Sequence, residues 1–563
     1  MSKKIYLMLT AVLVLVMTIG IYYANVDAQY ETPAGKTAQK EKNVKVETCY
    51  ECHDQIKELH TMGMHAKVNC ANCHKGLEKH LKAEVQTPDT RPVTDTSWEA
   101  CGQCHKEQYD SFMKTAYHRP ARDEKSQLTN RSPNPFWDKL MMGHGFTKEH
   151  NLTRSHNKML IDHLVVDRSY GGRFQGKNGW EYILESGRVW DVLEDKYPDV
   201  ADHKAFIPQS APAANSVCLQ CKSQDQILKW AYMGDPVDGA EWSRTSKVIE
   251  VAKDLQHGLN CFYCHDPHAA KPRIVRDGLI DALTKPDGDT LWHKDPNRTG
   301  IKVIDMGLRG FTRKIAMLDK YDTRLQCGQC HVEYNCNPGY DPKNSDISKP
   351  SVTMADRRTN HFPYKDVFGL YDHYVNKVSF LDFKHALTGG LLWKAQHPEA
   401  ESYYNSKHAK AGAGCDSCHM PKMKDKKTGK EYTSHFAVTP SIQIKEACLK
   451  CHPKWTEEQA KYTIDSIKAH IRGKMRKAEF WLSNLIDKIV EGKKAGLDAE
   501  IIKQAQDQHL RAHILWEYWT AENSDGFHNP EMAREALTKS VDESQKGIKI
   551  INDAIAAMAP PAK

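Results

Sequence analysis

The sequence predicts a mainly α-helical protein with long loops and a C-terminal bundle of long helices. Clear helical periodicity appears beyond Pro453, and no earlier region is rich in β-strand patterns. Only 40% of the 563 residues are hydrophobic and the mean hydropathy is −0.66, which is low for so long a chain. We therefore expect bulky apolar groups other than side chains to fill part of the interior.

Three helices are predicted after Pro453. The first ends at Lys493-Lys494, before Gly496, and the second runs from Asp498 to about Asn523. Asn529 as N-cap and Pro530 at the first helical position open the third, which ends before Pro560. We expect these helices to form a scaffold and a subunit interface. The apolar stripe of the first helix consists of Ile464, Ile467, Ile471, Met475, Leu482, Leu485 and Ile489.

The N-terminus has the features of an export signal. Lys3 and Lys4 precede an apolar run, and Val26-Asp27-Ala28 offers a cleavage site before Gln29. The run is also just long enough to span a bilayer, so a retained anchor is the alternative to cleavage. Either way, the body of the protein is expected in the periplasm.

Sixteen of the 17 Cys form eight C-x-x-C pairs, seven followed by His and one by Lys. Two thiols at this spacing can add to the two vinyl groups of a haem, and the next residue then reaches the iron. Zinc ribbons and disulfides are the alternatives, but neither requires His after each pair. The pattern therefore predicts eight covalent haems and a haem-filled core. The motifs are Cys49/Cys52/His53, Cys70/Cys73/His74, Cys101/Cys104/His105, Cys218/Cys221/Lys222, Cys261/Cys264/His265, Cys327/Cys330/His331, Cys415/Cys418/His419 and Cys448/Cys451/His452.

The expected haems change how the net charge of the chain is interpreted. A formal net charge of +7 would ordinarily point to nucleic acid or a membrane surface. Haem propionates add about −2 per haem, so the holoprotein is expected to be net acidic. We expect no nucleic-acid partner.

Lys222 marks an exceptional haem. The seven His-anchored haems need a second axial ligand if they only carry electrons, and 29 His supply enough. Lysine binds iron only when neutral, and burial favours the neutral form. We expect the Lys222 haem to have altered electronics and an open face.

Further strings around these motifs resemble the ammonia-forming cytochrome c nitrite reductases. They are Cys327-Gly-Gln-Cys330-His331-Val332-Glu333-Tyr334, Lys394-Ala395-Gln396-His397-Pro398-Glu399 and Cys418-His419-Met420-Pro421-Lys422 followed by Tyr432-Thr433-Ser434-His435. With the Lys222 motif, their order covers roughly residues 112–530 and is shared by the pentahaem enzymes. Three additional motifs precede it, so the chain resembles the octahaem nitrite reductases and, more distantly, hydroxylamine oxidoreductase.

The resemblance implies a distal pocket of Arg168, Tyr334 and His397 over the Lys222 iron. Arg168 follows Arg154-Ser155-His156 at the family's spacing, and Arg173 is the second choice. Arginine can hold nitrite oxygens, and histidine can donate protons near neutral pH.

The resemblance also implies a thioether between Tyr334 and Cys336, for which a buried free thiol is the alternative. It implies calcium held by the Glu333 and Gln396 side chains and by the carbonyls of Tyr334 and Lys394. A plain hydrogen-bond network is the alternative to calcium.

The remaining site predictions concern iron ligands. Asp266-Pro267-His268 is interpreted as a haem-edge or propionate contact rather than a catalytic group. The predicted distal ligands are His118, His408, His435 and His528, with His60, His65 and His80 for the three N-terminal haems.

The predicted activity is six-electron reduction of nitrite to ammonium, with hydroxylamine and sulfite as further substrates. Hydroxylamine or hydrazine oxidation is one alternative, but the oxidising relatives depend on a His-anchored catalytic haem. A pure electron carrier without an open iron is another. A quinol-linked or soluble cytochrome donor and a homo-oligomer, a trimer or a multiple of it, are expected by analogy. The expected parts are a signal peptide or anchor (1–28), a trihaem region (29–111), a pentahaem catalytic core (112–455) and a long-helix region (456–563).

Overall fold

The computed structural model describes residues 44–114, 136–143, 155–161, 215–247, 250–251, 254–255, 257–307 and 310–558. It divides into two compact units. One comprises the described residues up to Asp54 together with Lys67–Thr96, and the other comprises Gln55–Ala66 and the residues from Ser97 onward. The predicted signal peptide lies outside the described residues.

The smaller unit is built from short elements. In its described part, only Ala71 and Leu77 are buried apolar side chains, too few to form a core of their own. His74 of β1 pairs with Thr94 of the antiparallel β2. The elements are α2 (Val46–Tyr50), η3 (Cys70–Asn72), β1 (His74–Lys75), α4 (Leu77–Lys82), η4 (Pro88–Thr90) and β2 (Val93–Thr94).

The larger unit is mainly helical, which confirms the predicted fold class. Most helices before residue 450 are single turns joined by long loops. They are α3 (Asp54–Met62), α5 (Trp98–Gly102), α6 (Lys106–Phe112), α8 (Trp137–Leu140), α9 (Met159–Ile161), α12 (Ser216–Leu219), α14 (Cys261–Cys264), α15 (Asp277–Thr284), α16 (Leu291–Lys294), α17 (Thr323–Cys327), α18 (Leu370–Asp372), α19 (Glu399–Tyr404), α20 (Lys407–Lys410), α21 (Cys415–His419) and α22 (Ile444–Ala447).

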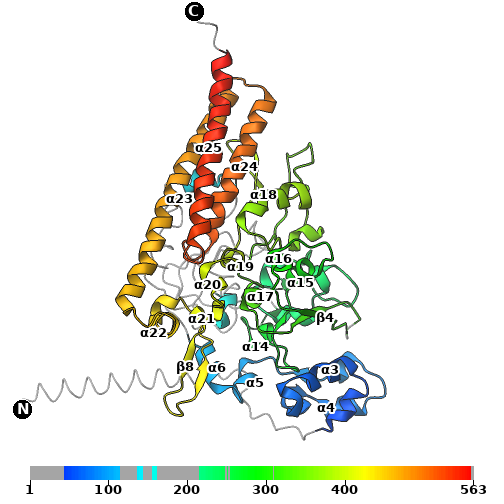
Figure 1. Ribbon diagram of the computed structural model, residues 1–563. Coiled ribbons are helices and arrows are strands. Elements are labelled where there is room, and N and C mark those ends of the chain that lie inside the picture. The colour runs from blue at the N-terminus through cyan, green and yellow to red at the C-terminus, as the bar shows by residue number, and fades with distance from the viewer. Residues whose placement is uncertain are drawn as a thin grey trace, which may run out of the picture. The chain divides into compact units, whose positions relative to one another are not determined.

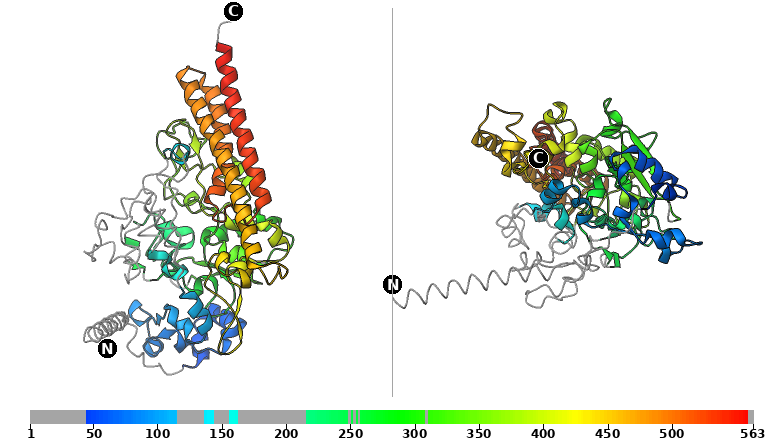
Figure 2. Two further views of the ribbon diagram at one scale, coloured as in Figure 1. Left: turned by 90° about the vertical axis from the view of Figure 1, so that its left-hand side faces the viewer. Right: turned by 90° about the horizontal axis from the view of Figure 1, so that it is seen from below.

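The three predicted C-terminal helices are present as α23 (Glu457–Lys494), α24 (Ala499–Ala521) and α25 (Pro530–Met558). They lie side by side in both Figure 1 and Figure 2. α23 begins earlier than its apolar stripe, because Thr456 and Gln459 form a capping box. Ile464 and Ile467 are only half-buried, whereas the rest of the stripe is buried.

A small sheet that the sequence analysis did not predict lies within the larger unit. β5 (Lys314–Leu318) is its centre, with β3 (Arg273–Ile274) and β4 (Ile301–Asp305) antiparallel on either side. Two-stranded ribbons join β6 (Phe383–Lys384) to β7 (Leu391–Leu392) and β8 (Lys422–Lys424) to β9 (Glu431–Thr433). The strands are too short to give a clear alternating pattern.

The helical bundle supports the loop that carries Lys394–Glu399. Trp516 and Trp519 of α24 belong to the same apolar cluster as Leu392 and Trp393. Farther along, the Tyr518 hydroxyl donates to the Pro398 carbonyl at 3.3 Å. The bundle therefore holds this loop through both apolar and polar contacts.

In the part of the chain that the structure describes, no helix is both long and apolar enough to cross a membrane. The long helices α23 to α25 instead bury one face against one another and expose the other.

Two helical glycines provide a test of the bundle packing. A Cβ at Gly547 would lie 2.6 Å from Leu485 Cδ1 and 3.1 Å from Gln508 Cβ, whereas at Gly473 it would meet nothing within 4 Å. Gly547→Leu should therefore lower the free energy of unfolding by about 1–3 kcal/mol through overpacking. Gly473→Leu, the matched control, should raise it by about 0.5–1 kcal/mol through helix propensity. Denaturant unfolding followed by circular dichroism measures both, and equal effects would contradict this packing.

Candidate active site

Most C-x-x-C pairs are presented by a tight local turn. His53, His105, His265, His331 and His452 donate a backbone hydrogen bond to the carbonyl of the first Cys of their motif, at 2.9–3.1 Å. This turn brings the residue after each pair close to the first Cys of its motif. None of the 17 Cys, all of which lie within the described residues, forms a disulfide.

The second motif, Cys70/Cys73/His74, differs from this geometry. The Cys73 amide donates to the Cys70 carbonyl at 3.2 Å at the end of the 3-10 turn η3, and the Cys73 carbonyl accepts from the Asp95 amide at 2.7 Å. His74 then leaves the turn as the first residue of β1, and its Nδ1 lies 3.1 Å from the Thr94 hydroxyl. Pairing of β1 with β2 therefore draws the chain out of the turn after Cys73. Haem attachment through Cys73 stays a prediction.

Six motif histidines each face a second histidine ring from another segment. In these pairs the ring centres are 6.1–6.5 Å apart. The pairs are His53–His80 at 6.2 Å, His65–His105 at 6.1 Å, His156–His331 at 6.4 Å, His265–His435 at 6.5 Å, His408–His452 at 6.4 Å and His419–His528 at 6.2 Å.

This repeated spacing fits a haem iron between the two rings. With metal–nitrogen bonds of about 2 Å on both faces, axial imidazole rings have their centres roughly 6 Å apart. Direct hydrogen bonding between the ring nitrogens would bring the centres closer. His361 and His373 show that case, with Nε2 atoms 2.7 Å apart and ring centres only 5.0 Å apart.

Several of the paired rings are oriented by a contact at Nδ1. Nδ1 lies 2.7 Å from the Pro267 carbonyl in His65, 3.1 Å from the Val438 carbonyl in His419 and 3.0 Å from the Thr433 carbonyl in His435. A proton donated from Nδ1 leaves Nε2 as the free lone pair, which is the form that binds a metal.

Burial also favours the neutral form of three of the paired rings. Burial, followed by the charge of the partner histidine, lowers the pKa of His156, His265 and His419 to about 4. Neutral imidazole is the form that coordinates iron.

The structure thus brings five of the seven predicted distal histidines to a motif histidine. Of the other two, His60 is buried on α3, and His118 lies outside the described residues, as do Arg168 and Arg173. His156, which pairs with His331, was not predicted as a ligand. The available signal was its place in Arg154-Ser155-His156, which served only to locate an arginine.

Lys222 occupies the most enclosed motif. Cys218 and Cys221 are buried, whereas the other motif cysteines are half-buried or exposed. Lys222 is itself 7% exposed, and its Nζ donates to the Cys218 carbonyl at 3.3 Å.

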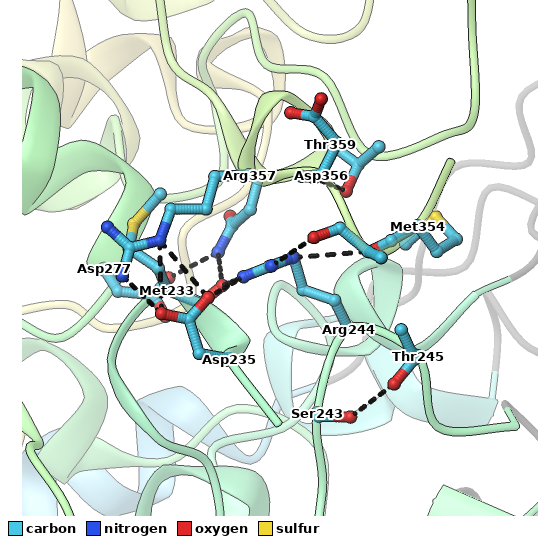
Figure 3. A network of polar contacts seen from close by, with 12 residues as sticks. Met233, Asp235, Ser243, Arg244, Thr245, Asp277, Met354, Asp356, Arg357 and Thr359 are labelled. Atoms are coloured by element: carbon cyan, nitrogen blue, oxygen red, sulfur yellow. Dashed lines mark hydrogen bonds and ion pairs between the residues drawn. The ribbon is translucent and has the colours of Figure 1, made fainter. Parts of the chain in front are cut away.

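The start of this motif is hydrogen-bonded to a polar network around Arg244 and Asp235, and Figure 3 shows that network. The Ser216 hydroxyl donates to the carbonyls of Ser243 and Arg244 at 2.8 and 3.0 Å. The Arg244 guanidinium in turn donates to Met233 O at 2.7 Å and to Asp235 Oδ1 at 2.5 Å. Asp235 also binds Arg357, so the 233–244 loop is tied to the segment that leads to Phe362.

Tyr334 and Cys336 lie beside the Lys222 motif. Cys336 Sγ is 3.7 Å from Cys218 Sγ, and Gln396 Nε2 lies 3.9 Å from the same Cys336 sulfur. Tyr334 is 5% exposed and stacks on Phe362, and burial raises its pKa well above the ordinary value. The segments of Lys222, Tyr334 and Gln396-His397 therefore converge, and Tyr334 holds its proton.

Arg276 is a neighbour of this site that the sequence analysis missed. It is 1% exposed, and its guanidinium lies 5.7 Å from the centre of the Tyr334 ring and 5.0 Å from that of Phe362. It donates to the Gln220 side chain, inside the Lys222 motif. No sequence pattern around Arg276 marked it, because only the fold brings it to Tyr334.

Three carboxylates, two buried and one half-buried, lie around the Lys394–Gln396 segment. Glu333 accepts from the Gln396 amide at 2.7 Å, Glu401 accepts from the Glu333 amide at 3.0 Å, and Asp382 accepts from the Lys394 amide at 2.9 Å. Burial raises the pKa of Glu333 and Glu401 well above normal and that of Asp382 to about 7. Carboxylates gathered in this way must either be protonated or have their charge neutralised by a bound cation.

A cation bound at these carboxylates would also need ligands other than acidic side chains. Within the described residues, no three His, Cys, Asp or Glu side chains are arranged as metal ligands. A calcium ion here would need the backbone carbonyls and the Gln396 amide as well. Hard oxygen donors of this kind suit calcium.

Asp266 has a structural role in the chain. Its carboxylate accepts from the amides of His268 and Ala269 at 2.9 and 2.8 Å and pairs with Arg273 at 2.9 Å. It thereby shapes the turn after the fifth motif, whose Pro267 carbonyl contacts His65. This contact links the turn to a paired histidine rather than to the Lys222 site.

Two known proteins are similar in sequence to this chain. The cytochrome c nitrite reductase subunit NrfA of Nitratidesulfovibrio vulgaris is 27% identical over 443 residues, covering 75% of this chain and 70% of that protein. Cytochrome c-552 of Haemophilus ducreyi is 30% identical over 450 residues, covering 77% of this chain and 71% of that protein.

A solved structure shares the fold. The catalytic subunit NrfA of cytochrome c nitrite reductase from Desulfovibrio desulfuricans, described with two calcium sites, superposes with a TM-score of 0.55 at 23% identity. The match covers 83% of this chain and 91% of that chain. The family model for cytochrome c552 matches residues 97–561. The chain therefore belongs to the cytochrome c552 family.

Proposed function

We propose that this protein is a periplasmic octahaem nitrite reductase that forms ammonium at the haem anchored by Lys222. The main observation in support is the buried Lys222 motif, on which the segments of Tyr334 and Gln396-His397 converge. Multiple c-type haems are expected of the family, and the related NrfA proteins are cytochrome c nitrite reductases. The eight motifs support eight haems in this chain.

Different side chains of the protein would have different roles in the reduction of nitrite. When bound, the Lys222 haem supplies electrons and a coordination position for the nitrogen of nitrite. We propose that Arg168 holds the oxygens of the anion and balances its charge. His397 would deliver protons as the N–O bonds break. Tyr334, kept protonated by burial, would donate a hydrogen bond to the same oxygens.

We propose that the six histidine pairs are the axial ligands of six electron-carrying haems. Contacts between thiols of different motifs support an order for these haems. Cys101 contacts Cys261, Cys264 is near Cys327, Cys330 contacts Cys221, Cys327 contacts Cys415, and Cys418 is near Cys448. In this order the third and fifth haems lead to the sixth from one side, and the eighth and seventh lead to it from the other. The sixth haem adjoins the Lys222 haem.

Export to the periplasm, a quinol-linked or soluble cytochrome donor and a homo-oligomer built on α23 to α25 remain parts of this proposal. Haem c attachment requires the two thiols to stay reduced until the haem adds. The signal-like N-terminus supports export before that step.

His397→Ala tests the proposed function directly. With a reduced viologen donor, we expect wild-type holoprotein to convert nitrite stoichiometrically into ammonium. The variant should lose about 100-fold or more in rate, the usual scale for a general acid. His470→Ala, at an exposed position on α23, is the control and should keep full activity. Haem reduction by hydroxylamine without nitrite turnover would indicate the oxidising reaction. Inertness toward both nitrite and hydroxylamine would indicate an electron carrier.

The Tyr334–Cys336 thioether would show in a mass spectrum. Its formation removes one hydrogen from the ring and one from the thiol, so the peptide should be about 2 Da lighter than its sequence mass. It should also resist alkylation at Cys336. Cys336→Ser should restore the mass expected from its sequence. A peptide of full mass that alkylates readily would identify Cys336 as a free thiol.

Calcium removal tests the proposed role of the carboxylates around Gln396. We expect a calcium chelator to lower both the unfolding temperature and the nitrite turnover, because the buried negative charge would lose its counter-ion. Added Ca²⁺ should restore both, and Mg²⁺, which demands octahedral geometry, should not. Unchanged stability and turnover in the chelator would favour a hydrogen-bond network without metal.

A further inference from the structure

His528 differs from the other paired histidines in what holds its ring. In His65, His419 and His435 the Nδ1 atom contacts a neutral backbone carbonyl. In His528 it lies 2.5 Å from Oε1 of the Glu522 carboxylate. His331 also has a carboxylate nearby, but its Nδ1 lies 3.6 Å from Glu399 Oε2.

Glu522 is built to remain a carboxylate. It is 3% exposed, and its second oxygen, Oε2, accepts from the Ser524 hydroxyl at 2.7 Å, the Ser524 amide at 3.2 Å and the Gly526 amide at 3.1 Å. These three contacts and the His528 contact all come from donors. A side chain surrounded only by donors acts as the acceptor, which is the role of an ionised carboxylate.

The turn after α24 fixes this arrangement. Asp525 and Gly526 adopt left-handed conformations, with φ of 53° and 77°, so the chain reverses directly behind Glu522. The Ser524 hydroxyl, which donates to Glu522, also accepts from the His528 amide at 2.9 Å. Glu522, Ser524 and His528 therefore form one closed network, with the other ring nitrogen of His528 left for the partner side.

That partner side faces the seventh motif. The His528 ring centre is 6.2 Å from that of His419, within the spacing of the other pairs. We propose that Glu522 is a positioning residue that fixes His528 as the axial ligand opposite His419 and lowers the reduction potential of that haem. This inference rests on the haem ligation proposed above. A carboxylate on the far nitrogen makes imidazole a stronger donor, and a stronger donor stabilises the more positively charged ferric iron.

The position of the seventh haem among the other haems gives its lowered reduction potential a function. The Cys415 thiol contacts Cys327 of the sixth motif, and Cys418 is near Cys448 of the eighth. The sixth motif adjoins Lys222 through Cys330 and Cys221. An electron on a low-potential seventh haem would pass to the sixth haem and on to the Lys222 haem with a favourable driving force. Glu522 would thus direct electrons toward the site of reduction.

Glu522→Gln removes the charge and keeps the size of the side chain. We expect the midpoint potential of one haem to rise by about 59 mV, a tenfold change in its reduction equilibrium. Spectroelectrochemical titration of the holoprotein measures the midpoint, and the low-spin electron paramagnetic resonance spectrum should change for one species. Glu522→Asp, which keeps the carboxylate, should give a smaller shift. Glu479→Gln, another buried carboxylate, bound to Trp516 and Arg476 and not to a paired histidine, is the control and should shift nothing.

The intact mass of each protein gives its number of haems. It therefore distinguishes a failure of this inference from a failure of the proposed function on which the inference rests. Eight haems per chain with unchanged potentials in Glu522→Gln would overturn the role of Glu522 and leave the haem ligation standing. Fewer than eight haems in the wild type would contradict the proposed function instead. Should Glu522→Gln fail to fold, Ser524→Ala, which removes the 2.7 Å contact to Oε2 and the hydroxyl that accepts from the His528 amide, should raise the same midpoint by a smaller amount. No change in that variant would equally overturn the inference.

Discussion

The arrangement of this chain depends on one repeated constraint, the pairing of a motif histidine with a histidine from a distant segment. Each pair closes a long loop, and loop closure costs conformational entropy that the loop itself cannot repay. In the smaller unit, where only two apolar side chains are buried in the described part, contacts between side chains supply little of that free energy. Covalent attachment and two axial bonds per haem would supply it, so ligand binding and folding are coupled.

The helical bundle has a different task. It has a conventional apolar core, and it reaches the site through a few polar contacts, among them the amide of Asn523, which donates to Glu399 at 3.0 Å. The loop with Gln396-His397 is thereby fixed between a rigid support and the Glu333 carboxylate. A loop held from both sides would change its geometry little if charges changed at the proposed site.

The sequence allowed the motifs and the long helices to be predicted because both are local. Cys218, Cys221 and Lys222 follow one another within a single turn, and the apolar stripe from Ile471 to Ile489 repeats within one helix. His156 and Arg276 could not be predicted in the same way, since their roles arise from contacts with His331 and with Tyr334. Resemblance to a family supplied several partner histidines, such as His435 and His528, that local patterns alone would not have selected. The short strands of the small sheet escaped prediction because each is defined by its partner strand.

Burial distinguishes the proposed catalytic haem from the others. The thiols of the Lys222 motif are buried, whereas Cys52, Cys104 and Cys451 of three other motifs are exposed. Haems attached near the surface can exchange electrons with a partner, while an enclosed haem must receive them through its neighbours. Enclosure also removes water, which strengthens the interaction of an anion with nearby cationic side chains. The same burial keeps Tyr334 protonated, so one physical condition would serve both anion binding and proton donation at the proposed site.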